Sequence, residues 1–254
     1  MLDKGDHHMV QDELYEAIFR RKSVREYAPD PLKPDALAKI SSFMTGLRPA
    51  FPGIRTELKL MNNADVQGMF KVDAPHFLVI FSEAKEGYLT NAGFMLQQMD
   101  LFFSANGIGS CWQGGPKLVG KAKGASDLEY VISIAFGDPS GDPHRKNRSE
   151  FKRKELVEIT NIDGYEDLLE SARLAPSAAN NQPWYFTGGN GIIHVNKAKS
   201  LILDRMNRIS AGIATCHLWL AALHSGGTPE IVIEKSGEAS PPKGYSYVAS
   251  ITTI

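Results

Sequence analysis

Cationic and hydroxyl side chains cluster at residues 20–25, Arg-Arg-Lys-Ser-Val-Arg, where a predicted first helix ends. Arg21, Ser23 and Arg25 alternate, so an extended backbone would point all three to one side. Two guanidinium groups and a hydroxyl can bind a phosphate, because arginine offers paired donors to phosphate oxygens. The alternatives are that these residues stabilise the C-terminal end of the helix or form a solvated charged surface.

Small residues, prolines and amides are concentrated at residues 175–184, Ala-Pro-Ser-Ala-Ala-Asn-Asn-Gln-Pro-Trp. The prolines stiffen this loop, while Ser177, Asn180 and Gln182 offer directed hydrogen-bond donors and acceptors. Such a loop suits recognition of a polar ring edge or a polyol chain. An ordinary turn after a helix is an equal alternative.

Glycines flank a strand-like segment at residues 107–115, Gly-Ile-Gly-Ser-Cys-Trp-Gln-Gly-Gly. The segment lacks the Gly-Lys-Ser/Thr ending of a P-loop and the third glycine of a dinucleotide-binding fingerprint. Its glycine pair, Gly114 and Gly115, has backbone amides that could approach a planar ligand.

The composition places these segments in an ordinary globular protein. The chain has 254 residues, 43% hydrophobic and 22% charged, with a net charge of −1, which allows a core that encloses a cofactor. A near-neutral chain exerts no global attraction on nucleic acid or on an anionic membrane. Its apolar runs are too short to span a bilayer. Cys111 and Cys216 predict two buried thiols and a reducing, cytoplasmic location rather than a disulfide framework.

Two long apolar helices are predicted at residues 91–106 and 210–225, and their glycines, Gly93 and Gly212, lie 119 positions apart. A strand at residues 130–134 recurs at 247–251 with nearly the same offset. These two similarities, at nearly the same offset, indicate a duplicated unit, although any α/β protein contains apolar helices and strands.

The remaining pattern predicts an α+β or α/β protein. Helices are expected at residues 14–20, 34–47 and 165–174, and strands at 56–61, 77–81, 184–187, 192–195 and 229–234. A polar, proline-containing stretch from residue 137 predicts a connecting arm. We therefore expect a first half at residues 1–160, with the arm at 137–160, and a second half at residues 161–254.

Together, the three segments resemble the FMN-binding elements of the nitroreductase family. The family pattern combines Arg-x-Ser-x-Arg/Lys, the loop Ala-Pro-Ser-x-x-Asn-x-Gln-Pro-Trp, a long helix ending in Gly-x-Gly-Ser-Cys-Trp-x-Gly-Gly, a Gly-x-Pro strand end and a basic tail. This chain carries all of them, and the loop string at residues 175–184 matches in full. The resemblance implies an FMN-dependent oxidoreductase with a three-layer α/β/α fold of the α+β class.

The order of these motifs departs from the family pattern. About 150 residues separate the arginine motif from the Ala-Pro-Ser loop, whereas some tens separate them in the family. Family members are usually homodimers in which the arginines come from one subunit and the loop from the other. A tandem fusion that kept the arginines in the first half and the loop in the second would retain one complete site. We therefore expect a monomer that forms an internal pseudo-dimer.

The resemblance also implies the residues that contact the cofactor: Arg21, Lys22, Ser23, Arg25, Gln113, Gly114, Gly115, Arg153, Pro176, Ser177, Asn180 and Gln182. The arginines, with Ser23 and Arg153, would bind the FMN phosphate. Ser177, Asn180 and Gln182 would bind the ribityl chain and the pyrimidine edge, and Pro176 would pack against the ring. The Gly114 amide, backed by Gly115, would donate to flavin N5.

The implied reaction is ping-pong transfer of a hydride from NAD(P)H through FMN to a nitroaromatic, quinone or similar small acceptor. It requires no metal and no acid–base triad, because the flavin carries the chemistry. One alternative is a flavin-binding or redox-sensing module without steady turnover, and another is a structural relic that binds no flavin.

Overall fold

The structure is a computed structural model that describes residues 4–234 and 240–253. Its first part contains α1 (Lys4–Ile18), α2 (Pro34–Thr45), β1 (Thr56–Asn62), β3 (His76–Ser82), α3 (Tyr88–Ala105), β4 (Gly109–Gln113) and β6 (Glu129–Gly137). The arm that follows contains η3 (Arg148–Phe151) and α4 (Leu156–Ile159). Its last part contains α5 (Glu166–Arg173), β7 (Trp184–Gly189), β8 (Ile192–Ala198), α6 (Asp204–His224), β9 (Ile231–Val232) and β10 (Tyr245–Thr252).

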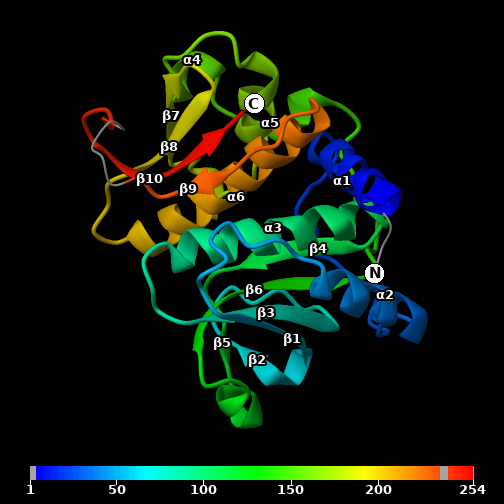
Figure 1. Cartoon of the computed structure of the whole chain (residues 1–254). Helices are drawn as coiled ribbons and strands as arrows, with labels where there is room; N and C mark the ends of the chain where they lie inside the picture. Colours follow the sequence, from blue (N-terminus) through cyan, green and yellow to red (C-terminus); the bar gives the residue numbers. More distant parts are fainter. Residues whose placement is uncertain (1–3, 235–239, 254) are drawn as a thin grey trace.

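Two four-stranded antiparallel sheets form the fold, one from each part of the chain, and they lie on either side of α3 and α6 (Figure 1). Their strand orders are β1-β3-β6-β4 and β7-β8-β10-β9. When the four strands of each sheet are numbered in the order in which they occur along the chain, both sheets have the spatial order first, second, fourth, third. In both halves the long helix lies between the second and third strands of the sheet in the chain order. The two halves share one topology.

The helices α3 and α6 pack against each other through glycine. A Cβ atom on Gly93 would lie 2.1 Å from the carbonyl oxygen of Ile209, and one on Gly212 would lie 2.0 Å from that of Thr90. Thr90 and Ile209 are separated by 119 positions, as Gly93 and Gly212 are. The two contacts are therefore reciprocal, because each glycine faces a carbonyl oxygen of the other helix and the same offset along the chain relates the two glycines and the two carbonyl residues.

Both helices are buried around most of their circumference, because each also packs on the sheet of its own half. This explains why neither helix has a strongly amphipathic sequence. The hydrophobic core is continuous through this layer and includes Phe94, Phe103, Trp184, Phe186 and Trp219. The layer thus joins the two halves into one core.

Most predicted elements are present, with shifted ends. The helix α6 begins at Asp204 rather than at residue 210, because its polar first turn is stabilised by ion pairs of Asp204 with Lys197 and Arg208. The expected strand at residues 229–234 is reduced to β9. Cys111 and Cys216 are buried free thiols, as predicted. Within residues 4–234 and 240–253, no helix is long and apolar enough to cross a membrane.

The outer face of the first sheet differs from the expected three-layer arrangement. A two-stranded ribbon of β2 (Val66–Gln67) and β5 (Lys117–Leu118), followed by the 3₁₀ turn η2 (Gly120–Gly124), covers this face. Val66, Leu118 and Ala122 pack there against Phe77 and Phe81 of β3. Strands of two residues have no readable periodicity, so the sequence pattern did not indicate this ribbon.

The glycine contact gives a direct stability prediction. Gly93→Ala would place a methyl group against the Ile209 carbonyl, so the helices must separate, at a cost of roughly 1–3 kcal/mol for overpacking. Urea unfolding should show that loss of free energy. Gly53→Ala is the control, because a Cβ there has no described neighbour within 4 Å. Equal effects of the two substitutions would contradict the close packing.

Candidate functional site

A cavity of about 470 Å³ lies where the two halves and the arm meet. We call it the cationic cavity; it is lined by Arg21, Lys22, Ser23, Arg25, Arg145, Glu150, Phe151, Lys152, Arg153, Pro176, Ser177, Ala179 and Asn180. Six of these side chains are cationic and one is a carboxylate, so the cavity has a strong excess of positive charge. Such a site favours an anionic ligand.

The arginine motif enters the cavity on an extended segment after α1. Ser23 forms a parallel bridge with Ser110 of β4, and Val24 N–H donates to the Ser110 carbonyl at 2.8 Å. This pairing keeps the segment extended, and Arg21, Ser23 and Arg25 all line the cavity. The prediction from their alternation is therefore confirmed for the geometry of the segment.

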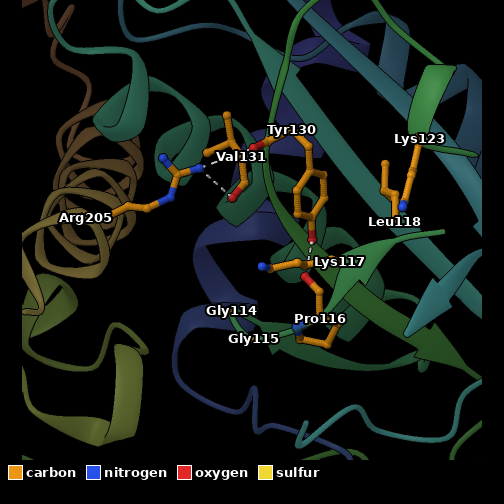
Figure 2. A pocket seen from close by; sticks show the side chains of 9 residues that line it. All are labelled: Gly114, Gly115, Pro116, Lys117, Leu118, Lys123, Tyr130, Val131 and Arg205. Carbon is orange, nitrogen blue, oxygen red and sulfur yellow. Dashed lines mark hydrogen bonds between the residues drawn. The ribbon is translucent and has the colours of Figure 1, made fainter. Parts of the chain in front are cut away.

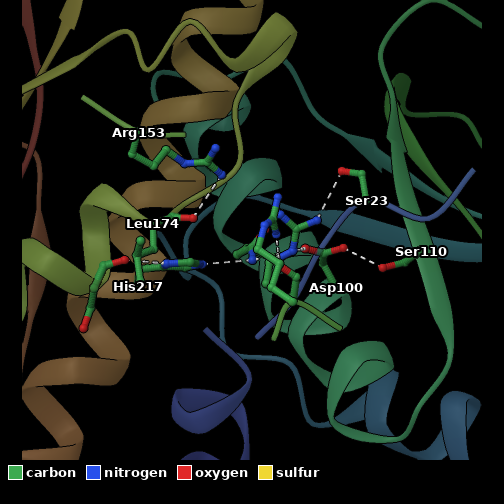
Figure 3. Close-up of polar contacts among 10 residues, drawn as sticks. Ser23, Asp100, Ser110, Arg153, Leu174 and His217 are labelled. Atoms are coloured by element: carbon green, nitrogen blue, oxygen red, sulfur yellow. Dashed lines mark hydrogen bonds and ion pairs between the residues drawn. The ribbon is translucent and has the colours of Figure 1, made fainter. Parts of the chain in front are cut away.

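Arg21 is held from behind by a buried carboxylate. Its Nε lies 3.0 Å from Asp100 Oδ2, and both side chains are at most 2% exposed. Asp100 also accepts a hydrogen bond from Ser110 Oγ at 2.7 Å, and Arg21 Nη2 donates to Ser23 Oγ at 3.3 Å (Figure 3). Asp100 thus fixes the guanidinium group at the wall of the cavity.

The hydrogen-bond network continues from Asp100 across the helix interface. Gln97 Nε2 lies 3.3 Å from Asp100 Oδ2 and 3.0 Å from His217 Nε2, and His217 Nδ1 lies 2.8 Å from the Ser171 carbonyl (Figure 3). Burial lowers the pKa of His217 to about 3, so its ring is neutral. Nδ1 then donates to the carbonyl and Nε2 accepts from Gln97. The imidazole therefore links α3, α5 and α6 without adding charge.

The arm brings Arg153 to the second half. Its Nη1 donates to Phe151 O and Asn180 Oδ1, and its Nη2 donates to Leu174 O at 3.2 Å. Among the described residues its buried Nε has no hydrogen-bond partner. Burial and the positive charges of Arg21, Arg145 and Arg173 lower the pKa of Arg153 to about 9.

Arg145 lies in the same electrostatic environment. Burial, together with the charge of Arg21, lowers the pKa of Arg145 to about 10. These downward shifts mean that the protonated guanidinium groups are held at a cost, because their charges are desolvated and repel one another. An anion in the cavity would offset that cost.

A second cavity, of about 250 Å³, adjoins the cationic cavity. We call it the apolar cavity; its lining is Ser23, Arg25, Cys111, Trp112, Gly114, Ile132, Pro176, Ser177, Ala178, Ala179, Met206, Ile209 and Ile213. Five of these residues also line the cationic cavity, namely Ser23, Arg25, Pro176, Ser177 and Ala179. The two cavities therefore form one elongated site, apolar at one end and cationic at the other.

The Ala-Pro-Ser loop, which lines both cavities, has a strained backbone. Ala179, Asn180 and Gln182 have φ values of 51°, 56° and 48°, in the left-handed region. Ser177 Oγ stabilises this conformation by accepting from Gln182 N–H at 2.8 Å. Such strain costs about 1–3 kcal/mol per residue and is typical of loops shaped for a ligand.

Some predicted site residues line neither the cationic nor the apolar cavity. The Gln113 side chain accepts from Val72 N–H at 3.0 Å, and the Gln182 side chain accepts from Lys154 N–H at 2.7 Å and donates to Asn180 O at 2.9 Å. Gln182 thus locks the loop to the arm. Gly115 lines a neighbouring cleft instead.

Other lining residues were missed by the sequence analysis. Arg145, Lys152 and Met206 reach the site through tertiary packing. A Cβ atom at Gly114 would lie 3.1 Å from Met206 Sδ. Asp100 could have been recognised from the sequence, because it is a single acidic residue within an apolar helix and a buried carboxylate needs a cationic partner.

Comparison with solved structures shows a similar fold over the whole chain. A crystal structure described as a "putative nitroreductase" from Thermotoga maritima has a TM-score of 0.67, with 21% identity, over 100% of this chain and 99% of that chain. A nitroreductase family protein from Clostridium difficile covers 60% of this chain and 98% of its own, with a TM-score of 0.45 and 16% identity.

The FMN-dependent nitroreductase NfnB from Mycobacterium smegmatis, solved in complex with NADPH, covers 63% of this chain and 100% of its own, with a TM-score of 0.44 and 15% identity. No curated protein matches the chain.

The family comparison covers most of the sequence. Residues 13–222 match the family described as "Putative TM nitroreductase". That span exceeds half of the 254 residues, and it includes the arginine motif, the arm and the Ala-Pro-Ser loop. The chain belongs to this nitroreductase family.

Proposed function

We propose that the chain is an FMN-dependent oxidoreductase that uses NAD(P)H to reduce a nitroaromatic, a quinone or a similar small acceptor. The observation that carries this proposal is the elongated site, with its apolar and cationic ends. FMN has the matching shape, a flat ring system joined by a polyol chain to a phosphate. Residues from both halves of the chain are needed to line the site.

The cationic end fits the phosphate. Arg25 is exposed and lines the cavity, and Ser23 offers a hydroxyl. Among the residues that the structure describes, Arg25 has no ion-pair partner and the buried Nε of Arg153 has no hydrogen-bond partner. A dianion there would offset the burial and the mutual repulsion that lower the pKa values of Arg145 and Arg153. We assign Arg21, through its ion pair with Asp100, to holding the wall of the phosphate site, with Lys22 at its rim.

The apolar end fits the ring. Pro176, Met206 and Ile213 would contact its faces and edges, and Ser177 and Asn180 would bind the polyol chain. The Gly114 amide would donate to the ring edge, with Gln113 and Gly115 as its backbone neighbours. When bound, FMN supplies hydride transfer between NAD(P)H and the acceptor. The residues of the chain bind and orient the reactants, and the apolar lining excludes water.

We further propose that the two halves arose by tandem fusion and form an internal pseudo-dimer, with a first half at residues 1–160 and a second at 161–254. The identical strand orders and the reciprocal contacts of Gly93 and Gly212 support this proposal. The arm contacts the second half, since Thr160 bridges Phe186 of β7. The proposal implies a monomer with one site.

Loss of Arg25 should weaken FMN binding without unfolding the protein. The Arg25 side chain is exposed, so Arg25→Ala should leave the melting temperature nearly unchanged. A lost charge-assisted contact to phosphate costs roughly 1.5–3 kcal/mol, about ten- to a hundredfold in Kd. Fluorescence titration with FMN measures this change. Arg20→Ala is the matched control, because Arg20 is exposed and lies outside the cavity lining; equal Kd values for the two variants would refute the assignment.

FMN should saturate the protein at one molecule per chain. The residues that line the cationic end come partly from the first half and partly from the second, so neither half has a complete set of its own. Equilibrium titration followed at the visible flavin absorbance tests the stoichiometry. Light scattering on the loaded protein should give a mass near 27.9 kDa. Saturation at two per chain, or flavin retained only in a dimer, would contradict the proposal.

Turnover separates an enzyme from a flavin-binding or redox-sensing module. We expect continuous NADH or NADPH oxidation when a nitroaromatic or a quinone is added to the FMN-loaded protein. A single stoichiometric reduction of the bound flavin, with no further consumption of NAD(P)H, would favour the module.

A further inference from the structure

A third hollow, of about 380 Å³, opens beside the apolar cavity. We call it the basic cleft; its lining is Gly114, Gly115, Pro116, Lys117, Leu118, Lys123, Tyr130, Val131 and Arg205 (Figure 2). Gly114 lines both the basic cleft and the apolar cavity, whereas none of the residues that the structure describes lines both the basic cleft and the cationic cavity. The cleft therefore adjoins the apolar end of the site, away from the cavity assigned to the FMN phosphate.

Among the described residues, three cations and no carboxylate line the basic cleft. Arg205 is fixed at the rim: its Nη2 donates to Tyr130 O at 3.3 Å and to Val131 O at 3.1 Å (Figure 2), and its Nη1 lies 3.1 Å from Glu129. Its charge is thus partly neutralised. Lys117 and Lys123 are exposed, and within the described ranges neither ammonium group has a carboxylate partner.

The local structure holds both lysines at the cleft. Lys117 lies on β5 beside Leu118, which is 6% exposed, and Lys123 lies on η2 beside Ala122, which is also 6% exposed. Leu118 and Ala122 anchor the ribbon and the turn in the cluster on the outer face of the first sheet. The neighbouring lysines are therefore positioned by buried residues.

The cleft offers a neutral polar wall as well as charge. The Tyr130 hydroxyl lies 3.1 Å from Ser133 Oγ and donates to Pro116 O at 3.3 Å. Burial raises the pKa of Tyr130, so its hydroxyl stays protonated. Neither this wall nor the apolar residues Leu118 and Val131 would repel an anion.

We propose that the basic cleft binds the carboxylate or phosphate group of the substrate that reacts at the flavin ring, with Lys117 and Lys123 as its main contacts. This inference rests on the proposed function. Two substrates could supply the anion: an acidic acceptor, or the phosphates of the dinucleotide donor. Their shared chemistry is an organic anion attached to a reactive group that reaches Gly114.

The test compares the double variant Lys117→Gln/Lys123→Gln with Lys121→Gln. Lys121 is exposed on the same turn but does not line the cleft, so it controls for net charge nearby. Steady-state kinetics on the FMN-loaded proteins would use 4-nitrobenzoate and its neutral analogue 4-nitrobenzyl alcohol as acceptors, and NADPH and NADH as donors.

If the acceptor supplies the anion, KM for 4-nitrobenzoate should rise about tenfold in the double variant, the loss of roughly one charge-assisted contact, with kcat nearly unchanged. KM for 4-nitrobenzyl alcohol should not change. If the donor supplies the anion through the 2′-phosphate, KM should rise for NADPH alone. If the donor supplies it through the diphosphate, KM should rise for both dinucleotides. Unchanged KM values for all four compounds, or equal changes in Lys121→Gln, would overturn the inference.

FMN titration of the same variants separates this inference from the proposed function. The double variant should bind FMN as the unaltered chain does; weaker binding would assign the lysines to the flavin and overturn the separate cleft. If the unaltered chain binds no FMN, the proposed function fails. Calorimetric titration of the flavin-free chain with 4-nitrobenzoate and with NADPH then tests the cleft alone: binding of either compound that is lost in the double variant supports it, and binding of neither compound, or binding kept in the double variant, overturns it.

Discussion

The close contact of α3 with α6 is the constraint on which the rest of the structure depends. The Ile209 carbonyl oxygen of α6 occupies the space where a side chain at Gly93 of α3 would begin, and the Thr90 carbonyl oxygen of α3 does the same for Gly212 of α6. This contact sets the distance between the two sheets, and with it the distance between the arginine motif of the first half and the Ala-Pro-Ser loop of the second. A larger residue at either glycine would move the two walls of the site apart.

Electrostatics decides what the site can bind. Asp100 neutralises Arg21 from within the core, where an unpaired charge would be costly, and the neutral His217 ties that carboxylate to the second half through Gln97. Of the described residues that line the cationic cavity, Glu150 alone supplies a carboxylate to the remaining cations. The cationic cavity therefore favours an anionic ligand. In the proposed complex, the flavin ring of FMN would extend into the adjoining apolar cavity.

The sequence predicted the local features of the fold well. The helices α3 and α6 and the strands of both sheets follow from apolar runs and their breaks, and the Ala-Pro-Ser loop is a contiguous motif. Arg145, Lys117 and Lys123 could not be found in this way, because each reaches its cavity through the packing of a short element or of the arm. Gln182 illustrates the converse: a motif residue predicted to face the cofactor has its amide bonded to the arm and the loop.

The central claim is that one chain builds a complete flavin site from its two halves, and subunit mixing tests it most directly. Arg25→Ala disables the cationic cavity through the first half, and Ala178→Phe fills the apolar cavity from the second. The two variants would be unfolded together, refolded as a mixture and titrated with FMN, after each alone is shown to fold. The account predicts that the mixture binds FMN no better than the average of the separate variants. Recovery of tight binding in the mixture would mean that the site forms between two chains, and would contradict the account.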